Sequence, residues 1–327
     1  MSFSSDVKDE LARLEGQSVC CQLSELAAIV SLGGTISLLG GGRMRLYVES
    51  EHAAVARTVF LRLKHIFDAH PELLTLRHAR LGGRNTYRLT LSGDEAAFVL
   101  EGCGILRQSE QGHMGVRRSI PKEITARKCC KRAFLRGAFM ASGSIANPER
   151  EYHAEFVCGD EGFANAFVRF LHKNGLNAKM VARKGQHVIY LKEADAIMDL
   201  LTLMGATRAR MELENIRIRK ELRNQANRAV NCDSANLKKT VDASDRQAEA
   251  IEYIRDHVGL ENLPAPLREI AQLRLNYREA SLIELGEMLD PPVGKSGVNH
   301  RLRRLLTLYQ ELTGSSAQSP TAGPADS

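Results

Sequence analysis

The chain has 327 residues, of which 43% are apolar and 26% charged, with a formal net charge of +6 at pH 7. This length suggests two or three domains with sizeable cores, and the basic excess suits a polyanionic partner without requiring one. No apolar run approaches the roughly 20 residues that span a bilayer, and no signal-peptide core is found, so we expect a cytoplasmic protein with no membrane partner.

The seven cysteines include two adjacent pairs, Cys20-Cys21 and Cys129-Cys130. Neither pair has the C-x-x-C spacing, no H-x-x-x-H motif lies nearby, and the histidines are scattered. This pattern indicates neither a zinc ribbon nor a disulfide scaffold. We therefore expect reduced thiols, several of them in the core, and neither a metal nor a cofactor.

Helices and strands alternate in the first part of the chain. A short helix is predicted at 7–14, and the apolar segment 20–36 predicts a longer one that ends in a glycine pair, as at a helix C-cap. The elements predicted after it are strands at 36–39 and 44–49, a helix at 52–69, strands at 73–80 and 85–91, and a helix at 94–102.

The same order of elements then recurs. CCKRAFLRGAFMASGSI at 129–145 matches CCQLSELAAIVSLGGTI at 20–36 in its leading cysteine pair, glycine end and closing isoleucine, at an offset of 109 (129 − 20). Such self-similarity indicates a duplication. We predict an α+β domain over 1–206, built from αββαββα repeats at about 20–104 and 129–205.

Two such repeats with glycine-ended lead helices resemble the LAGLIDADG homing-endonuclease fold. In that family a metal-binding acid precedes the final glycine of each lead helix, whereas Gly33 and Ser142 stand at those positions here. Two-metal cleavage of a phosphodiester needs carboxylate oxygens, so we expect that the protein is not an enzyme. Asp160 and Glu161 could replace the lost acids, but they are interpreted as the cap and first-turn charge of a helix.

Two basic segments flank the second repeat. The connection at 105–132 carries secondary candidates for DNA or phosphate contact, with a merely solvated connection as the alternative; the candidates are Arg117, Arg118, Lys122 and Arg127. Residues 207–232 predict a basic helical linker, which either lies along phosphates or spans two domains.

From 233 to 312 the sequence predicts an all-α domain. Short helices are expected at 232–241, 243–258 and 264–277, and residues 313–327 are expected to be disordered. Ser281 and Glu284 have the spacing of a capping box that opens one more short helix. The segment 290–294, with two prolines and a glycine, must end that helix, and a last helix is predicted at 295–312.

This last helix has two faces. Val298, Leu302 and Leu305 lie on an apolar stripe. The opposite face offers donors that suit DNA: base-edge contacts are predicted for Asn299, His300 and Arg303, and phosphate contacts for Lys295, Ser296 and Arg304. Helix, tight turn and donor-rich helix together indicate a helix-turn-helix with 295–312 as recognition helix, although a solvated surface helix shares the pattern.

A degenerate duplicated motif followed by a helical domain that ends SLIELGEMLDPPVGKSGVNHRLRRL is similar to the WhiA family of bacterial regulators. The resemblance implies a sequence-specific transcription regulator of promoter DNA, involved in cell division, chromosome segregation and, in sporulating actinobacteria, sporulation septation. It implies a helix-turn-helix domain similar to region 4 of sigma factors, association with the nucleoid, and a WhiB-like iron-sulfur regulator and RNA polymerase as partners. The alternatives are a protein-interaction scaffold of the transcription machinery and a residual homing-type endonuclease.

Overall fold

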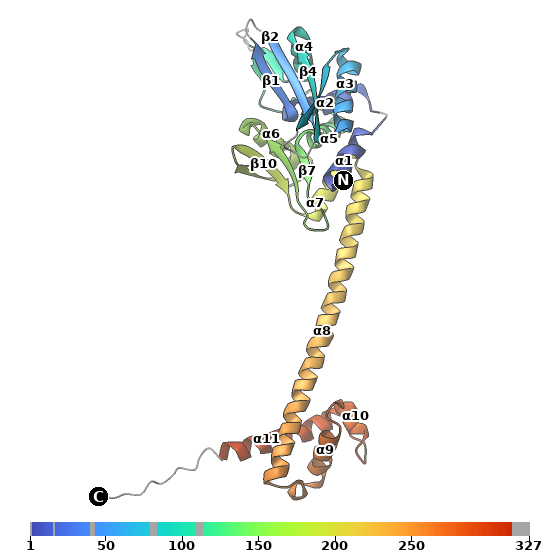
Figure 1. Cartoon of the computed structure of the whole chain (residues 1–327), viewed down its shortest axis with the longest axis vertical. Helices are drawn as coiled ribbons and strands as arrows, with labels where there is room; N and C mark the ends of the chain where they lie inside the picture. Colours follow the sequence, from blue (N-terminus) through green and yellow to red (C-terminus); the bar gives the residue numbers. More distant parts are fainter. Residues whose placement is uncertain (1, 16, 40–42, 79–83, 109–113, 316–327) are drawn as a thin grey trace, which may run out of the picture. The chain divides into compact units, whose positions relative to one another are not determined.

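The computed structural model describes residues 2–15, 17–39, 43–78, 84–108 and 114–315 (Figure 1). The chain divides into two compact units, Met1–Glu221 and Leu222–Ser327. No helix in the described ranges combines the length and apolar composition that crossing a membrane requires.

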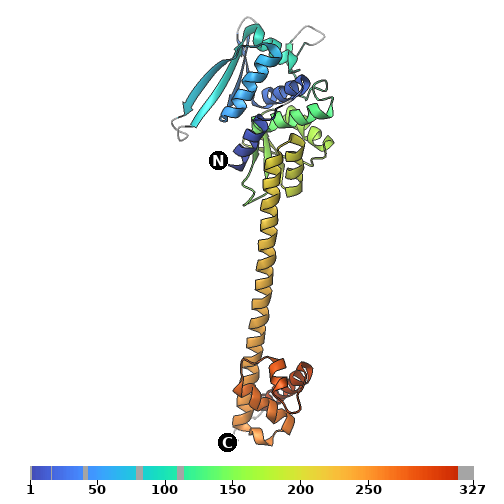
Figure 2. The same cartoon turned by 90° about the vertical axis from the view of Figure 1, so that its right-hand side faces the viewer.

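Two helices, α2 (Val19–Gly33) and α5 (Lys128–Ser142), lie side by side at the centre of the first unit (Figures 1 and 2). Their backbones approach closely, because a Cβ atom on Gly137 would lie 2.1 Å from the carbonyl oxygen of Glu25. Only glycine fits at that crossing. The close approach makes the two lead helices one shared core element rather than the edges of two separate domains.

Each central helix leads directly into an antiparallel four-stranded sheet. The strand orders β1-β2-β4-β3 and β7-β8-β10-β9 are the same, which confirms the predicted duplication. The strands are β1 (Gly34–Leu39), β2 (Arg43–Ser50), β3 (Glu72–His78) and β4 (Arg84–Ser92), then β7 (Gly143–Ile145), β8 (Ala154–Cys158), β9 (Lys179–Arg183) and β10 (Gln186–Leu191).

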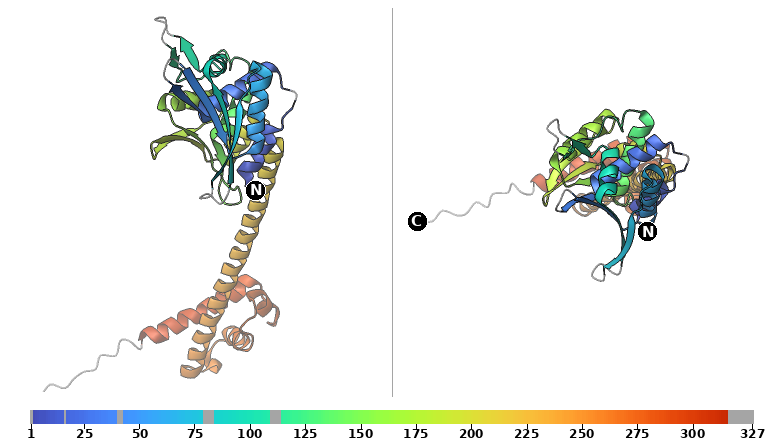
Figure 3. Two further views of the ribbon diagram at one scale, coloured as in Figure 1. Left: turned by 45° about the horizontal axis from the view of Figure 1, so that its top comes forward. Right: turned by 90° about the horizontal axis from the view of Figure 1, so that it is seen from above.

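Five further helices complete this unit; α3 lies along the first sheet in Figure 3. They are α1 (Phe3–Ala12), α3 (Ala53–Phe67), α4 (Gly93–Gly102), α6 (Glu161–Lys173) and α7 (Ala194–Met204). One continuous apolar core joins both repeats, from Val7 to Leu213. The connection between the repeats contains a hairpin that was not predicted, β5 (Leu106–Gln108) and β6 (Met114–Val116), because strands of three residues carry almost no periodicity.

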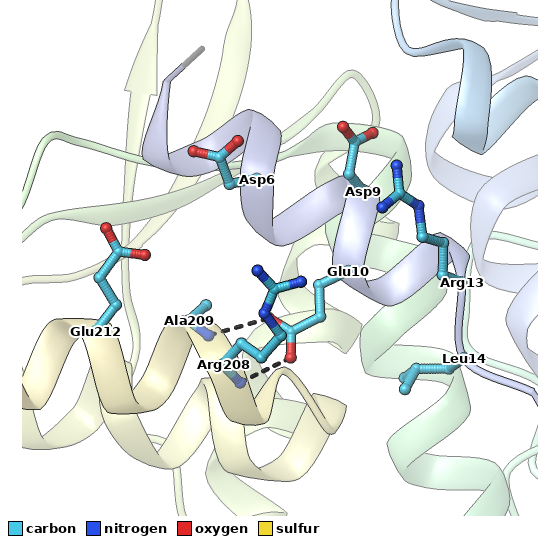
Figure 4. Close-up of a pocket in the computed structure, with 8 residues that line it drawn as sticks. All are labelled: Asp6, Asp9, Glu10, Arg13, Leu14, Arg208, Ala209 and Glu212. Carbon is cyan, nitrogen blue, oxygen red and sulfur yellow. Dashed lines mark hydrogen bonds between the residues drawn. The ribbon is translucent and has the colours of Figure 1, made fainter.

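Helix α8 (Thr207–His257) runs for 51 residues as one helix, where the sequence analysis predicted three. That prediction was wrong: it ended one helix near 232 and another near 242, although no glycine or proline occurs within α8. Its first turn is capped by Glu10, whose carboxylate accepts bonds from the amides of Arg208 (2.7 Å) and Ala209 (3.0 Å) (Figure 4). The groove in Figure 4 is therefore explained by the contact of Glu10 with the start of α8.

The second unit consists of helical elements over its described residues, 222–315. They are the end of α8, a 3₁₀ turn η2 (Leu260–Asn262), α9 (Ala265–Asn276), α10 (Leu282–Glu287) and α11 (Lys295–Ser315). They share one core, in which Ile251, Ile254, Ile270 and Leu285 are fully buried. Because α11 continues to Ser315, the prediction that 313–315 are disordered was wrong: the lone Gly314 does not end the helix. The rest of that predicted tail, 316–327, lies outside the described residues.

Candidate nucleic-acid interface

Helix α10 starts with the predicted capping box. The amide of Glu284 donates to Ser281 Oγ at 3.3 Å, and the amide of Ser281 donates to Glu284 Oε2 at 2.7 Å. The bond from the Ser281 amide, followed by that from the Ser281 side chain, holds the pKa of the Glu284 carboxyl below its usual value, since both stabilise its charged form. The start of the motif is thus fixed by its own side chains.

Gly286 fixes the turn that follows, a role that the sequence analysis missed. The amide of Val293 donates to the carbonyl oxygen of Gly286 at 2.9 Å, and a Cβ atom at position 286 would lie 2.0 Å from the carbonyl oxygen of Val293. Any larger residue would push the turn away from α10. The available signal was a glycine inside a short apolar helix, where it costs about 1 kcal/mol relative to alanine unless close packing requires it.

The apolar stripe predicted for α11 is confirmed. Val298 and Leu302 are fully buried and Leu305 is 1% exposed. Tyr309 packs edge-to-face on Tyr253 of α8, with ring centroids 5.2 Å apart. Burial of this stripe determines which face of α11 stays in solvent.

The opposite face presents the six predicted contact residues. Asn299 is half-buried, and the others are exposed: Lys295, Ser296, His300, Arg303 and Arg304. Within the described ranges, no carboxylate forms an ion pair with Lys295, Arg303 or Arg304. The first turn of a helix also leaves backbone amides without intrahelical acceptors, which attracts anions to the same end.

A buried arginine, Arg274 of α9, supports this motif from behind. It is 2% exposed, and its Nη1 donates to the carbonyl oxygens of Ala280 (2.7 Å) and Arg278 (3.1 Å) and to Ser244 Oγ (3.3 Å). Because these acceptors belong to α8 and to the loop before α10, Arg274 ties three segments together. It holds the helix-turn-helix on its scaffold.

The four secondary candidates belong to the first unit, and two of them have carboxylate partners. Arg117 pairs with Glu123 at 3.1 Å, and Arg118 lies 3.5 Å from Asp160. Lys122 is exposed. The remaining candidate, Arg127, lies 3.9 Å from Cys20 Sγ. Charge pairing therefore weakens two of these four as phosphate contacts.

Gly33 and Ser142 are the last residues of α2 and α5, where the homing-endonuclease fold would carry its acids. Ser142 Oγ turns back to the carbonyl oxygen of Ala138 at 3.5 Å. Asp160 caps α6 by accepting from the amide of Phe163 at 2.8 Å, and Glu161 lies in the first turn, as interpreted from the sequence.

The other ends of α2 and α5 bring four cysteines together. The Sγ atoms of Cys20, Cys21, Cys129 and Cys130 all lie within 4.8 Å of one another. Their convergence was not predicted. It arises because each pair opens a central helix and these helices start side by side. The signal was available in the sequence: the pairs recur at the offset of 109 (129 − 20) that relates the two repeats.

A duplicated LAGLIDADG-like domain followed by a helix-turn-helix domain defines the class of this protein. Three family models match the chain: the WhiA N-terminal LAGLIDADG-like domain at 19–106, the WhiA LAGLIDADG-like domain at 131–223 and the WhiA C-terminal HTH domain at 226–309. The chain therefore belongs to the WhiA family.

Relatives and a solved structure agree with this assignment. The chain is 46% identical over 306 residues to the "Probable cell division protein WhiA" of Alkaliphilus metalliredigens, covering 93% of this chain and 96% of that protein. It is also 46% identical over 311 residues to the protein of that name from Heliobacterium modesticaldum, covering 95% and 96%. The crystal structure of full-length DUF199/WhiA from Thermatoga maritima has the same fold, with a TM-score of 0.56, 23% identity and coverage of 95% of this chain and 99% of that one.

Proposed function

We propose that this protein is a sequence-specific transcription regulator that reads promoter DNA with α11. The observation that carries the proposal is the exposed face of α11, whose cations have no ion-pair partner among the described residues while its opposite face is locked into the core. A surface helix without a binding role usually carries carboxylates that pair with its cations. Here Glu311, near the far end, is the one carboxylate within α11.

The positions of these residues around α11 can be compared with the contacts to base edges and to phosphates that we propose for them. At about 100° per residue, Asn299, Arg303 and His300 fall at about 0°, 40° and 100° around the helix. Lys295 and Arg304 fall outside this arc, at about −40° and 140°. A helix in the major groove turns the centre of its exposed face to base edges and its margins to the two phosphate backbones.

The buried stripe of Val298, Leu302 and Leu305 is centred at about −95°, so the exposed face is centred at about 85°, with His300 nearest that centre and the half-buried Asn299 at its margin. Position therefore supports base readout by His300 and Arg303, and for Asn299 the proposal rests on its chemistry. Arginine pairs with two acceptors of guanine, and asparagine with adenine, in a bidentate manner. Lys295, Ser296 and Arg304 would position the helix on phosphates without reading sequence.

The biological setting is part of the proposal and rests on the family. Because curated relatives are named probable cell division proteins, we assign the regulator to cell division. The family resemblance adds chromosome segregation and, in sporulating actinobacteria, sporulation septation to the proposal. It would act at the nucleoid in the cytoplasm, beside RNA polymerase and a WhiB-like iron-sulfur partner. Nuclease activity is not part of the function, since Gly33 and Ser142 supply no carboxylate for a catalytic metal.

Binding measurements with the full chain test the assignment. A binding site is first selected from genomic fragments, and fluorescence anisotropy then compares that site with random DNA. We expect Arg303→Ala to weaken specific binding by about 1 to 3 kcal/mol, and Lys295→Ala to weaken both DNAs alike and flatten the salt dependence. Arg255→Ala, which removes an exposed charge that pairs with the adjacent Asp256, is the control and should change neither.

Failure to select any site would favour the scaffold alternative, in which the helix-turn-helix contacts protein. Equal losses for Arg303→Ala and Lys295→Ala on both DNAs would contradict the proposed roles. Nicking of plasmid in the presence of Mg²⁺ would instead support the residual endonuclease.

A further inference from the structure

The four-cysteine cluster lies between the N-terminal ends of α2 and α5 and has no part in the proposed DNA contacts. Cys21 and Cys130 are buried against Ala133, Cys20 is half-buried and Cys129 is exposed. The site is thus anchored in the core at one side and open to a small solute at the other.

Backbone contacts hold the two cysteine pairs in place. Ser24 Oγ of α2 donates to the carbonyl oxygen of Cys130 at 2.7 Å in a buried bond, which fixes the start of α5 against α2. Ser18 Oγ lies 3.2 Å from Cys20 Sγ and 3.3 Å from Cys21 Sγ. A hydroxyl that bonds both sulfurs of one pair is the kind of outer contact that orients metal ligands.

The sulfur positions fit a tetrahedral metal. With Zn–S bonds of about 2.3 Å, four sulfurs around one zinc ion lie about 3.8 Å apart. Here the sulfurs of Cys129 and Cys130 are 4.0 Å apart, and all four lie within 4.8 Å of one another. Shifts of about 1 Å or less in the sulfur positions would complete the coordination.

The surrounding charge favours thiolates. The positive ends of two helix dipoles meet at the cluster, and Nη1 of Arg127 lies 3.9 Å from Cys20 Sγ. Four thiolates around Zn²⁺ leave a net charge of −2, which these positive groups offset.

This site differs from the catalytic metal site of the homing-endonuclease fold. That position corresponds to Gly33 and Ser142, at the other ends of the same helices, roughly 20 Å away at 1.5 Å per residue. A disulfide needs a sulfur–sulfur distance of about 2.05 Å, whereas all four cysteines are free thiols here.

We propose that Cys20, Cys21, Cys129 and Cys130 bind one Zn²⁺ ion as four thiolates and thereby link the two repeats at the N-terminal ends of their central helices. Four protons leave the thiols as the metal enters, and no oxidation takes place. A closed site with four protein ligands is structural, since it keeps no open position for a substrate.

Cobalt substitution of the full chain tests the site. The reduced, metal-free protein is titrated with Co²⁺, whose tetrahedral complex with four thiolates absorbs strongly in the visible range, and then with Zn²⁺. We expect saturation at one Co²⁺ per chain and loss of the absorbance on addition of one equivalent of Zn²⁺. Metal analysis of protein purified without chelator should find one zinc per chain.

Variants locate the metal. Cys20→Ser and Cys129→Ser should each abolish the four-thiolate spectrum, and Ser18→Ala should weaken Zn²⁺ binding by about 10- to 100-fold. The control Cys232→Ser, an exposed cysteine on α8, should bind as wild type. Because Cys20 and Cys129 are not buried, their variants should keep the wild-type circular dichroism.

Two results would overturn the proposal. One is a fully reduced wild-type protein that gives no thiolate–cobalt absorbance, or an absorbance that survives in Cys20→Ser and Cys129→Ser. The other is a disulfide between the two pairs, found by mass spectrometry of protein isolated without reductant, in place of bound zinc, which would make the cluster a redox pair.

Discussion

Glu25, a carboxylate buried between α2 and α5, offers a sharp test of how the two repeats are held together. Its side chain is 1% exposed, its Oε2 accepts from Arg136 Nε at 2.6 Å, and Arg62 lies 3.5 Å away. Arg136 also donates to Gln17 Oε1 at 2.6 Å and to the carbonyl oxygen of Met204 at 3.1 Å. Glu25→Ala therefore leaves a buried guanidinium without its counter-ion.

The cost of that substitution can be worked out from this geometry. Charge centres about 4 Å apart attract by about 4 kcal/mol at an effective dielectric constant of about 20. Breaking a buried pair by removing one partner costs about 3 to 5 kcal/mol, because the remaining charge is uncompensated. For a unit of this size, that loss lowers the melting temperature by roughly 6 to 20 °C.

Differential scanning calorimetry of the full chain measures the effect on the transition of the first unit. The control is Glu49→Ala, which breaks the exposed cross-strand pair of Glu49 with Arg88 and should cost less than about 1 kcal/mol. If Glu25→Ala destabilised the unit no more than Glu49→Ala, the buried network would contribute nothing and this reasoning would be refuted.

Two further predictions concern the helix-turn-helix. Gly286→Ala should lower DNA affinity at least about 10-fold and destabilise the second unit by about 1 to 3 kcal/mol, since its Cβ would lie 2.0 Å from the carbonyl oxygen of Val293. Gly294→Ala, which has open space at its Cβ, is the matched control, and equal effects of both in anisotropy and urea unfolding would contradict the packing argument. The lowered pKa of Glu284 means that its stabilising effect is present above the unfolded carboxyl pKa and is lost as pH falls through the folded pKa. The difference in unfolding free energy between wild type and Glu284→Gln should therefore shrink toward acidic pH. A difference that grew on acidification would contradict the role assigned to the Glu284 carboxylate.

Local patterns predicted much of this architecture from the sequence. The repeat was visible because its cysteine pair, small residues and terminal glycines keep one spacing in both copies. The capping box of Ser281 and Glu284 located the start of α10, and the stripe of Val298, Leu302 and Leu305 oriented α11. The capping box and the apolar stripe each depend on residues within a few helical turns, and the tertiary contacts agree with both.

Features that depend on distant segments could not be predicted in the same way. Glu25 and Arg136 meet only because two helices pack, and neither residue marks the other in the sequence. In the sequence Gly286 is only a residue that weakens a helix, whereas in the structure the turn places Val293 against it. The length of α8 was underestimated because polar residues are compatible with both a helix and a break, and only a proline or glycine would have decided for the break.

The central claim is that α11 reads promoter DNA, and genome-wide crosslinking with sequencing of the bound DNA tests it most directly. Wild type is compared with the double variant Asn299→Ala, Arg303→Ala. If α11 reads promoter DNA, wild type should give discrete promoter peaks that share a sequence motif and vanish in the variant. Diffuse occupancy, or peaks that the variant leaves unchanged, would contradict it and would move DNA recognition to the N-terminal domain or to a partner.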